Sequence, residues 1–272
     1  PVESKIPVKP FTADDLKIGD YYYSDGTTSD GGYRKYPDDN TAILNIEPVL
    51  TNPATGEKRT CIGIVYWVGD PTKPLRNLLG DETLANCTNG LVVSLGEESC
   101  TWQANYTSVQ DWLNSNHSGE FLSVQSGTDA SDPLNNIQGY NNTKAIEAFN
   151  KSPDNSGSQV YVVQKVVEYR KEVPAPEASS GWYVPSEKEL TLLCGEDVDD
   201  IYAKNSGGTA NRDLINSKLG LISATALSSS SLYWSSTEYS LGNAFNVGFD
   251  YGLVNGGDKG FGSYRVRFSL AF

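Results

Sequence analysis

The sequence predicts an α+β fold that forms one elaborated domain. Short, continuous apolar runs rich in β-branched residues indicate strands, and amphipathic segments that begin at capping residues indicate helices. The chain has 272 residues and shows neither an internal repeat nor a second linker, and this length can bury one large core. We therefore expect residues 1–10, with their three prolines, to be a linker and residues 11–272 to form a single domain.

The first half of the chain is expected to supply strands. A cluster of tyrosines precedes the dipeptides Asp25-Gly26 and Asp30-Gly31, which tolerate the positive φ angles of turns. Two later runs, CIGIVYWVGD and GLVVSLGE, have continuous apolar cores, which are typical of strands buried on both faces. The predicted strands are residues 20–23, 42–50, 61–70 and 90–97.

Two helices are predicted in the polar middle of the chain. Ser108 is a candidate N-cap for residues 108–115, where three apolar side chains share one face. Thr143 is the candidate cap of a second helix over residues 142–150, which also carries an apolar face.

The clearest helix signal begins at Ser186. Glu189 stands three residues later and completes a capping box before a leucine-rich stretch. A further short helix is predicted at residues 214–223. Residues 159–170 (QVYVVQKVVEYR) fit either a strand or a helix, and their β-branched content favours a strand.

The C-terminal part is predicted to be β-structure. The segments YWSST, AFNVGFD and YRVRFSLAF are expected to be joined by turns rich in Gly and Asn. In the last segment, apolar residues that would face the core alternate with residues that would face outward, as in a half-buried strand. The first set is Val266, Phe268, Leu270 and Phe272, and the second is Arg265, Arg267, Ser269 and Ala271.

Charge excludes two classes of partner. The chain has 34 acidic and 21 basic residues and a net charge of −13, so it lacks the basic face that nucleic acid or anionic lipid requires. No apolar run is long enough for a membrane span or a signal-peptide core. Because the chain begins at Pro1 and has no Met, we expect a mature or trimmed fragment.

The four cysteines, Cys61, Cys87, Cys100 and Cys194, include no CxxC pair. Zinc sites usually use close pairs, so this spacing argues against zinc and against a thioredoxin-like motif. Two disulfides of unknown connectivity or a set of buried thiols both fit. The even number favours an oxidising, extracytoplasmic location.

Motifs of catalysis are absent from the sequence. His117 is the only histidine and has no G-x-S-x-G elbow beside it. The acidic residues at 196–200 do not have the spacing of a calcium loop, so we interpret them as solvated surface. The same interpretation applies to Asp129 and Asp132. No phosphate-binding glycine loop is present. We expect no enzymatic activity, no cofactor and no metal.

Several motifs are similar to a known pattern. GWYVPS with Glu189-Leu190, then YWSSTE, then Ala244-Phe245-x-Val247-x-Phe249, then Arg265-Val266-Arg267 resemble the signature of bacterial domains with a C-type lectin-like fold. GDYYYSDGTTS, IGIVYWVGD, GLVVSLGE and YNNTKAIEAFN resemble a Bacteroidetes surface-protein family that carries this domain. The resemblance implies small antiparallel sheets and two main helices, with core motifs in residues 140–272, elaborated by N-terminal strands and long loops.

The same resemblance implies a recognition site in residues 239–264. Some members of the fold are variable proteins of diversity-generating retroelements, whose diversified codons yield Asn, Asp, Gly, Ser and Tyr but not Lys or Glu. Lys259 is the one residue of the excluded kind in this segment. The ligand-binding residues expected to face outward are Tyr239, Asn243, Phe245, Asn246, Asp250, Tyr251, Asn255, Asp258, Phe261 and Tyr264. The family pattern has Trp at the position of Phe245, which also fits a core role.

Two relatives of the fold are weakened by missing motifs. Calcium-dependent lectins carry EPN or QPD triplets, which do not occur here. Formylglycine-generating enzymes use cysteines in the C-terminal half, whereas the last cysteine here is Cys194.

We therefore expect an extracellular adhesin, at the cell surface or outer membrane, whose segment 239–264 displays a variable recognition face. Its expected partners are an unknown protein or glycan on another cell or on a phage or host surface, and other pilus subunits. The alternatives are a structural pilus or surface subunit without a variable site, and a hydrolase that acts on surface polysaccharide.

Overall fold

The computed structural model of the protein describes residues 16–31, 33–35, 42–44, 47–72, 84–125, 137–202 and 207–272. Of residues 33–35 and 42–44 it describes the backbone only. The linker expected at residues 1–10, and Asp129 and Asp132, lie outside the described residues.

The described chain combines helices and strands, as an α+β fold requires. The strands of the first part are β1 (Tyr21–Tyr23), β2 (Thr28–Ser29), β3 (Tyr33–Lys35), β4 (Ala42–Leu44), β5 (Cys61–Val68), β6 (Gly90–Ser94) and β7 (Glu98–Cys100). The helices are α1 (Val109–Asn116), α2 (Gly139–Lys151), α3 (Tyr161–Glu172), α4 (Glu187–Cys194) and α5 (Ala210–Leu221). The last strands are β8 (Leu232–Glu238), β9 (Asn243–Gly248), β10 (Leu253–Asp258), β11 (Tyr264–Val266) and β12 (Ser269–Ala271).

Two five-stranded sheets organise the molecule. The first sheet has the order β12-β6-β5-β1-β2 and is antiparallel throughout. The second has the order β10-β9-β8-β11-β7, in which β11 and β8 are parallel and the other pairs antiparallel. Each sheet therefore combines strands from the two ends of the chain. A separate ribbon consists of β3 and β4.

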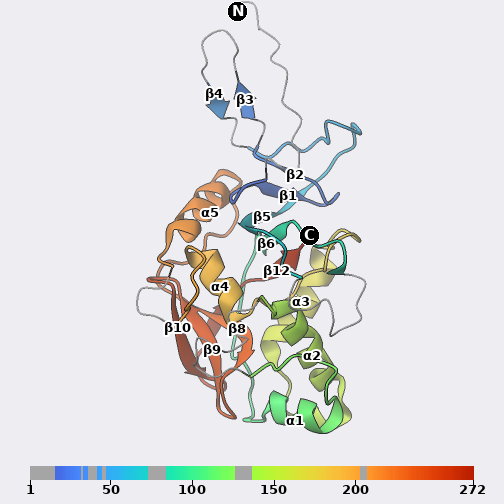
Figure 1. The fold of residues 1–272 in the computed structure, drawn as a ribbon, viewed down its shortest axis with the longest axis vertical. Helices are drawn as coiled ribbons and strands as arrows, with labels where there is room; N and C mark the ends of the chain where they lie inside the picture. The colour runs from blue at the N-terminus through green and yellow to red at the C-terminus, as the bar shows by residue number, and fades with distance from the viewer. Residues whose placement is uncertain are drawn as a thin grey trace, which may run out of the picture.

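The first sheet is buried on both faces, as its continuous apolar runs predict. Ile64, Tyr66 and Val93 pack into one core cluster with leucines of α4 and α5. Val65 and Val92 pack into a second cluster, which contains three tryptophans and the apolar faces of α2 and α3. Figure 1 shows α4 and α5 on one side of the body and α1, α2 and α3 on the other, with β8, β9 and β10 at the lower left.

Capping chemistry sets the start of α4 and α1 as predicted. The Ser186 side chain accepts a hydrogen bond from the Glu189 backbone N–H, and the Glu189 carboxylate accepts one from the Ser186 backbone N–H at 2.7 Å. At α1, Ser108 Oγ accepts from the Asp111 N–H at 3.0 Å. Both caps are local, so sequence spacing alone could identify them.

The expected start of α2 at Thr143 is wrong. The helix begins at Gly139, and Thr143 lies inside it, where its Oγ1 accepts a hydrogen bond from the Val184 N–H at 2.9 Å. The Gly139 N–H at the true N-terminus donates to Glu189 Oε2 at 2.8 Å. A cap supplied from 50 residues away leaves no local sequence signal.

The strand favoured for residues 159–170 is also wrong, because this segment is α3. Val162, Val163 and Val166 are buried, and Tyr169 packs against Trp182 and Phe268. These positions share one face of a helix, and the burial of that face overrides the β-branched preference.

The C-terminal segment departs from the predicted single strand. It divides into β11, in the second sheet, and β12, in the first. Arg267, expected on the outer face, is fully buried, where it donates to the Ser94 carbonyl at 2.9 Å and pairs with Glu97 at 3.3 Å. Residues 253–258, expected as part of a turn, form β10. Of the strand predicted at 42–50, β4 covers only Ala42–Leu44, and Leu50 is exposed.

All four cysteines are thiols, so the disulfide alternative does not hold. Burial raises the pKa of Cys61, Cys100 and Cys194 to about 12. Thiols of this kind are unreactive at neutral pH, because the thiolate is the nucleophile.

Candidate binding face

The hairpin of β9 and β10 carries most of the predicted site residues. The two strands pair at six positions, from Leu253 opposite Gly248 to Asp258 opposite Asn243. Beyond the hairpin, the Lys259 N–H donates to the Gly242 carbonyl at 2.9 Å, which fixes the turn after β8 against the turn after β10. These two turns lie at one end of the second sheet.

The structure divides the ten predicted residues into three groups. Two are half-buried, Asn243 and Tyr264, and two are buried, Phe245 and Asn246. The remaining six are exposed: Tyr239, Asp250, Tyr251, Asn255, Asp258 and Phe261. The outward orientation expected for Phe245 and Asn246 is therefore wrong.

Packing explains the two buried residues. Phe245 contacts Tyr239, with 4.8 Å between ring centroids, and lies 6.0 Å from the ring of Tyr202, which agrees with the alternative core role. Asn246 pairs with Trp234 across the sheet. Neither its Nδ2 nor its Oδ1 has a hydrogen-bond partner among the described residues. Tyr264 stacks on Trp234 at 4.5 Å and so belongs mainly to the scaffold.

Four large side chains gather around the two turns, and we call them the aromatic patch: Tyr106, Tyr239, Leu241 and Phe261. Their exposed fractions are 53%, 38%, 58% and 78% respectively. Tyr106 Oη donates to Asp258 Oδ1 at 2.8 Å, which holds its ring beside Gly242 and Gly260. This hydrogen bond raises the pKa of Tyr106.

Sequence reasoning missed Tyr106 and Leu241. Leu241 lies within the predicted segment but was not selected among the polar and aromatic residues. Tyr106 lies 152 residues before Asp258, and nothing local in its polar surroundings distinguishes it from any other loop tyrosine. Only the fold brings it to the patch.

A buried ion pair supports the patch from beneath. Lys259 Nζ donates to Glu238 Oε1, and both side chains are fully buried. Burial lowers the pKa of Lys259, and the Glu238 charge opposes that shift. Glu238 also accepts from the Val109 and Gln110 N–H groups, each at 3.0 Å, and so caps α1. The ion pair therefore joins β8, the turn after β10 and α1 in one rigid base.

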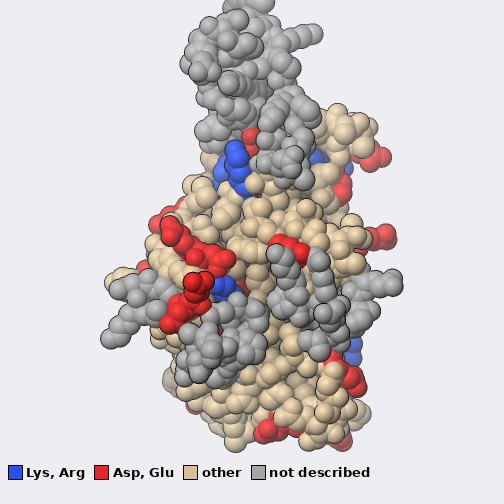
Figure 2. Space-filling view, viewed as in Figure 1, with Lys and Arg blue, Asp and Glu red and all other residues tan. Residues whose placement is uncertain are grey.

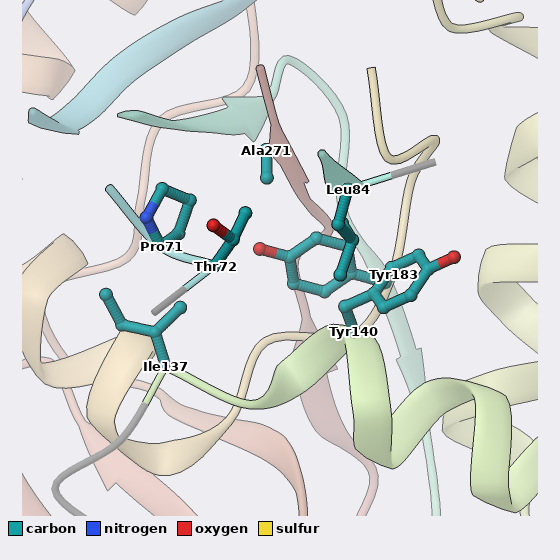
Figure 3. A pocket seen from close by; sticks show the side chains of 7 residues that line it. All are labelled: Pro71, Thr72, Leu84, Ile137, Tyr140, Tyr183 and Ala271. Atoms are coloured by element: carbon teal, nitrogen blue, oxygen red, sulfur yellow. The ribbon is translucent and has the colours of Figure 1, made fainter. Parts of the chain in front are cut away.

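One small cavity lies in the core of the described chain. The cavity in Figure 3 has a volume of about 10 Å³, which is room for one water molecule. Its lining is mainly apolar and includes Tyr140, Tyr183 and Thr72. Two carboxyls have raised pKa values because of burial, Asp20 at about 6 and Glu189. Glu189 is occupied as a helix cap, and Asp20, just before β1, accepts a hydrogen bond from the Lys17 N–H at 2.7 Å.

The remaining candidates have structural roles. His117 Nδ1 lies 2.9 Å from Glu120 Oε2, and its ring packs on Trp112 at the end of α1. Asp197 accepts from Lys188 Nζ at 2.6 Å and from Trp67 Nε1 at 3.3 Å. Figure 2 shows acidic side chains gathered beside α4. Among the described residues, no cluster of His, Cys, Asp and Glu could hold a metal ion.

In the part of the chain that the structure describes, no helix has the length and apolar character needed to cross a membrane.

Comparison with known proteins points to the fimbrial proteins of bacteria. The chain is 28% identical over 277 residues to the putative fimbrium tip subunit Fim1C of Bacteroides ovatus, a match that covers 94% of this chain and 46% of the relative. A crystal structure of a fimbrial protein from Bacteroides ovatus ATCC 8483 superposes with a TM-score of 0.65 at 29% identity, covering 94% of this chain and 49% of that one.

The chain thus spans about half the length of the proteins it matches. No model of a known protein family matches it. The chain is thus similar in sequence and in fold to part of these fimbrial proteins.

Proposed function

We propose that this chain is part of a fimbrial tip subunit and that the aromatic patch binds a partner on another surface. The observation that carries the proposal is the concentration of exposed Leu241 and Phe261 on two adjoining turns, with exposed Tyr106 held beside them by its hydrogen bond to Asp258. Contiguous exposed apolar groups of this size mark interaction sites, because they lose free energy in water without a partner. The names of the similar proteins support the fimbrial setting.

The patch has the character of a pre-organised recognition surface. Tyrosine and phenylalanine offer large rigid contact areas at low cost in conformational entropy. The buried pair of Lys259 and Glu238 fixes both turns before any partner arrives. The expected partner is a protein or glycan on another cell or on a phage or host surface, and the opposite end of the subunit is expected to contact other pilus subunits.

We further propose that residues 239–264 divide into replaceable and fixed positions within a C-type lectin-like arrangement. The exposed side chains, such as Tyr251 and Asn255, lie outside both core clusters and can change without altering them. Lys259, Phe245 and Asn246 are buried, so variation there would disturb the scaffold. Sequences of the same locus from several isolates should vary at the exposed positions and keep Lys259.

A structural pilus subunit without a ligand face is the second candidate. It is favoured by the name of the similar protein, fimbrium tip subunit, which states a place in the fimbrium and no ligand. This alternative predicts that substitutions in the aromatic patch leave adhesion unchanged.

The test compares two double variants of matched chemistry. Tyr106→Ser with Phe261→Ser removes exposed rings from the patch, and Leu50→Ser with Leu214→Ser removes apolar groups that are 54% and 41% exposed elsewhere. Beads coated with each protein are applied to a glycan array and to epithelial and bacterial cell layers. We expect the patch variant to lose about tenfold in binding, since a few aromatic anchors usually dominate an interface. Equal binding by all three proteins would favour the structural subunit.

A further inference from the structure

The outer edge of β10 is the least protected sheet edge among the described residues. β10 pairs with β9 along its six residues and has no second strand beside it. Of the other edges of the two large sheets, β2 and β7 have two and three residues. The outer side of β12 is bonded to Ser180 and Tyr183. Figure 1 shows β10 at the outer margin of the molecule.

The register shows which backbone groups of β10 face outward. The Lys259 N–H donates to the carbonyl of Gly242, the residue directly opposite, so the backbone groups of this pair face each other. The Asn243 carbonyl accepts from the Tyr239 N–H, so it points toward β8 and away from β10. In an antiparallel pair, residues alternate between facing the partner strand and facing away from it. With the pairing of β9 and β10, this places the N–H and C=O groups of Val254 and Gly256 on the open side.

The strand carries no lysine, proline or bulge that would protect it against edge pairing. Natural edge strands are blunted by lysine, proline, bulges or shortness. β10 reads Leu-Val-Asn-Gly-Gly-Asp and pairs with β9 without a break in register. Gly256 leaves room for the Tyr239 ring, whose Cδ1 would lie 3.2 Å from an added Cβ. An incoming strand would therefore meet an aromatic surface on one side of the edge.

The charge around this edge is negative. Asp250 and Asp258 are exposed at the two ends of β10, and Glu196 is exposed in the segment that follows α4, a helix that contacts β10. Among the described cations, Lys259, Lys188 and Arg212 are buried and paired with Glu238, Asp197 and Asp213 respectively. The exposed carboxylates at the two ends of β10 favour a cationic partner.

We propose that the outer edge of β10 binds an extended, cationic segment of a partner polypeptide by strand addition. Backbone hydrogen bonds to Val254 and Gly256 supply affinity, Tyr239 packs against an apolar side chain, and Asp250 and Asp258 pair with lysine or arginine. A second copy of this chain is a poor occupant, because pairing β10 with itself would bring carboxylates and two chains of net charge −13 together. The proposal shares Tyr239 with the aromatic patch and does not require Tyr106, Leu241 or Phe261 to bind any ligand.

The test uses the whole chain and three synthetic peptides of about eight residues, the length of an ordinary strand. The first alternates valine and lysine, the second replaces lysine by glutamate, and the third is the lysine peptide with alternate backbone nitrogens methylated on one edge. Binding is measured by fluorescence anisotropy at about 0.15 M salt, where long-range attraction is screened. Amide hydrogen exchange is followed at Val254 and Gly256.

We expect the lysine peptide to bind and to slow exchange at these two amides. The glutamate and methylated peptides should bind about tenfold more weakly. Equal binding by the methylated peptide would show attraction by charge alone and overturn strand addition. Concentration-dependent self-association through β10, with no peptide binding, would overturn the choice of partner.

Variants give an independent check. Gly256→Pro removes an outward N–H at a position where an edge strand tolerates proline, and it should weaken binding about tenfold. Asn255→Ser is the control, because the backbone N–H and C=O groups of residue 255 face β9. This variant should bind the lysine peptide as the wild type does. Leu241→Ser with Phe261→Ser leaves Tyr106, Tyr239 and Asp258 in place and should also keep peptide binding, which separates this edge from the rest of the aromatic patch. Unchanged affinity in a folded Gly256→Pro protein, together with unchanged amide exchange in the wild type, would reject the proposal.

Discussion

Two buried carboxylates each close the N-terminus of a helix that lies far away in sequence. Glu189 caps α4 locally and accepts from Gly139 at the start of α2, while Glu238 accepts from the first two N–H groups of α1. A helix N-terminus has unsatisfied donors and a partial positive charge, so a buried anion there is stabilised. Single residues thus connect helices to the sheets that carry the binding face.

Asp20 is a buried carboxyl whose proton affinity affects stability. Its Oδ2 accepts from the Lys17 N–H at 2.7 Å, yet burial raises its pKa from 3.8 to about 6, with the Asp30 charge adding to the effect and Lys218 opposing it. The folded state therefore binds a proton more tightly than the unfolded state. By linkage, the contribution of Asp20 is most favourable below pH 4 and is lost as pH rises to about 6.

We predict that Asp20→Asn stabilises the protein by about 2–3 kcal/mol at pH 7 and has little effect at pH 4. The asparagine side chain can still accept from Lys17 and carries no charge to bury. Urea unfolding of both proteins at pH 4, 5, 6 and 7 measures the difference, with the exposed Glu57→Gln as control. A gain that is the same at every pH would contradict this account.

At the scale of elements, the start of α2 is packed more tightly than any sequence signal suggests. A Cβ added at Gly139 would lie 2.3 Å from Glu189 Oε2 and 2.7 Å from both the Ser186 nitrogen and the Val184 oxygen. The glycine is needed here because three groups of another element approach its backbone, and two of them are themselves backbone atoms.

Gly139→Ala should lower the free energy of unfolding by about 2–4 kcal/mol, since the rigid junction of α2 and α4 must separate. Gly220 in α5 is the matched control, because an added Cβ there meets no atom within 4 Å. Gly220→Ala should raise stability by about 0.5–1 kcal/mol through helix propensity. Thermal melts of the two variants should move in opposite directions, and a shared direction would refute the packing argument.

The whole molecule is held together by pairings between its two ends. β12 pairs with β6, β11 pairs with β7, and Trp234 Nε1 donates to the Cys100 carbonyl at 3.0 Å. Removing the first half would expose β12 and leave the buried Arg267 without Glu97. These long-range contacts join the two halves of the described chain.

A fragment of residues 140–272, which contains the motifs of the resemblance, should therefore fail to fold alone. We expect weak near-ultraviolet circular dichroism and no cooperative melt, whereas residues 16–272 should unfold in a single transition. The cause is the loss of β5, β6 and β7, which supply the centre of the first sheet and an edge of the second. A cooperative transition in the fragment would show that the C-terminal half is an independent domain.

Local patterns determined those parts of the protein whose causes lie within a few residues. The capping box at Ser186, the cap at Ser108 and the doubly buried strands β5 and β6 follow from short-range hydrogen bonding and continuous apolar runs. Within residues 239–264, six of the ten side chains predicted to face outward are exposed.

The tertiary structure decided everything that depends on partners far along the chain. It made residues 161–172 a helix, because one face of that helix fills the second core cluster. It buried Phe245 and Asn246, paired Lys259 with Glu238, and brought Tyr106 to the patch from 152 residues away. The physical reason is that burial and long-range pairing stabilise more strongly than local propensity.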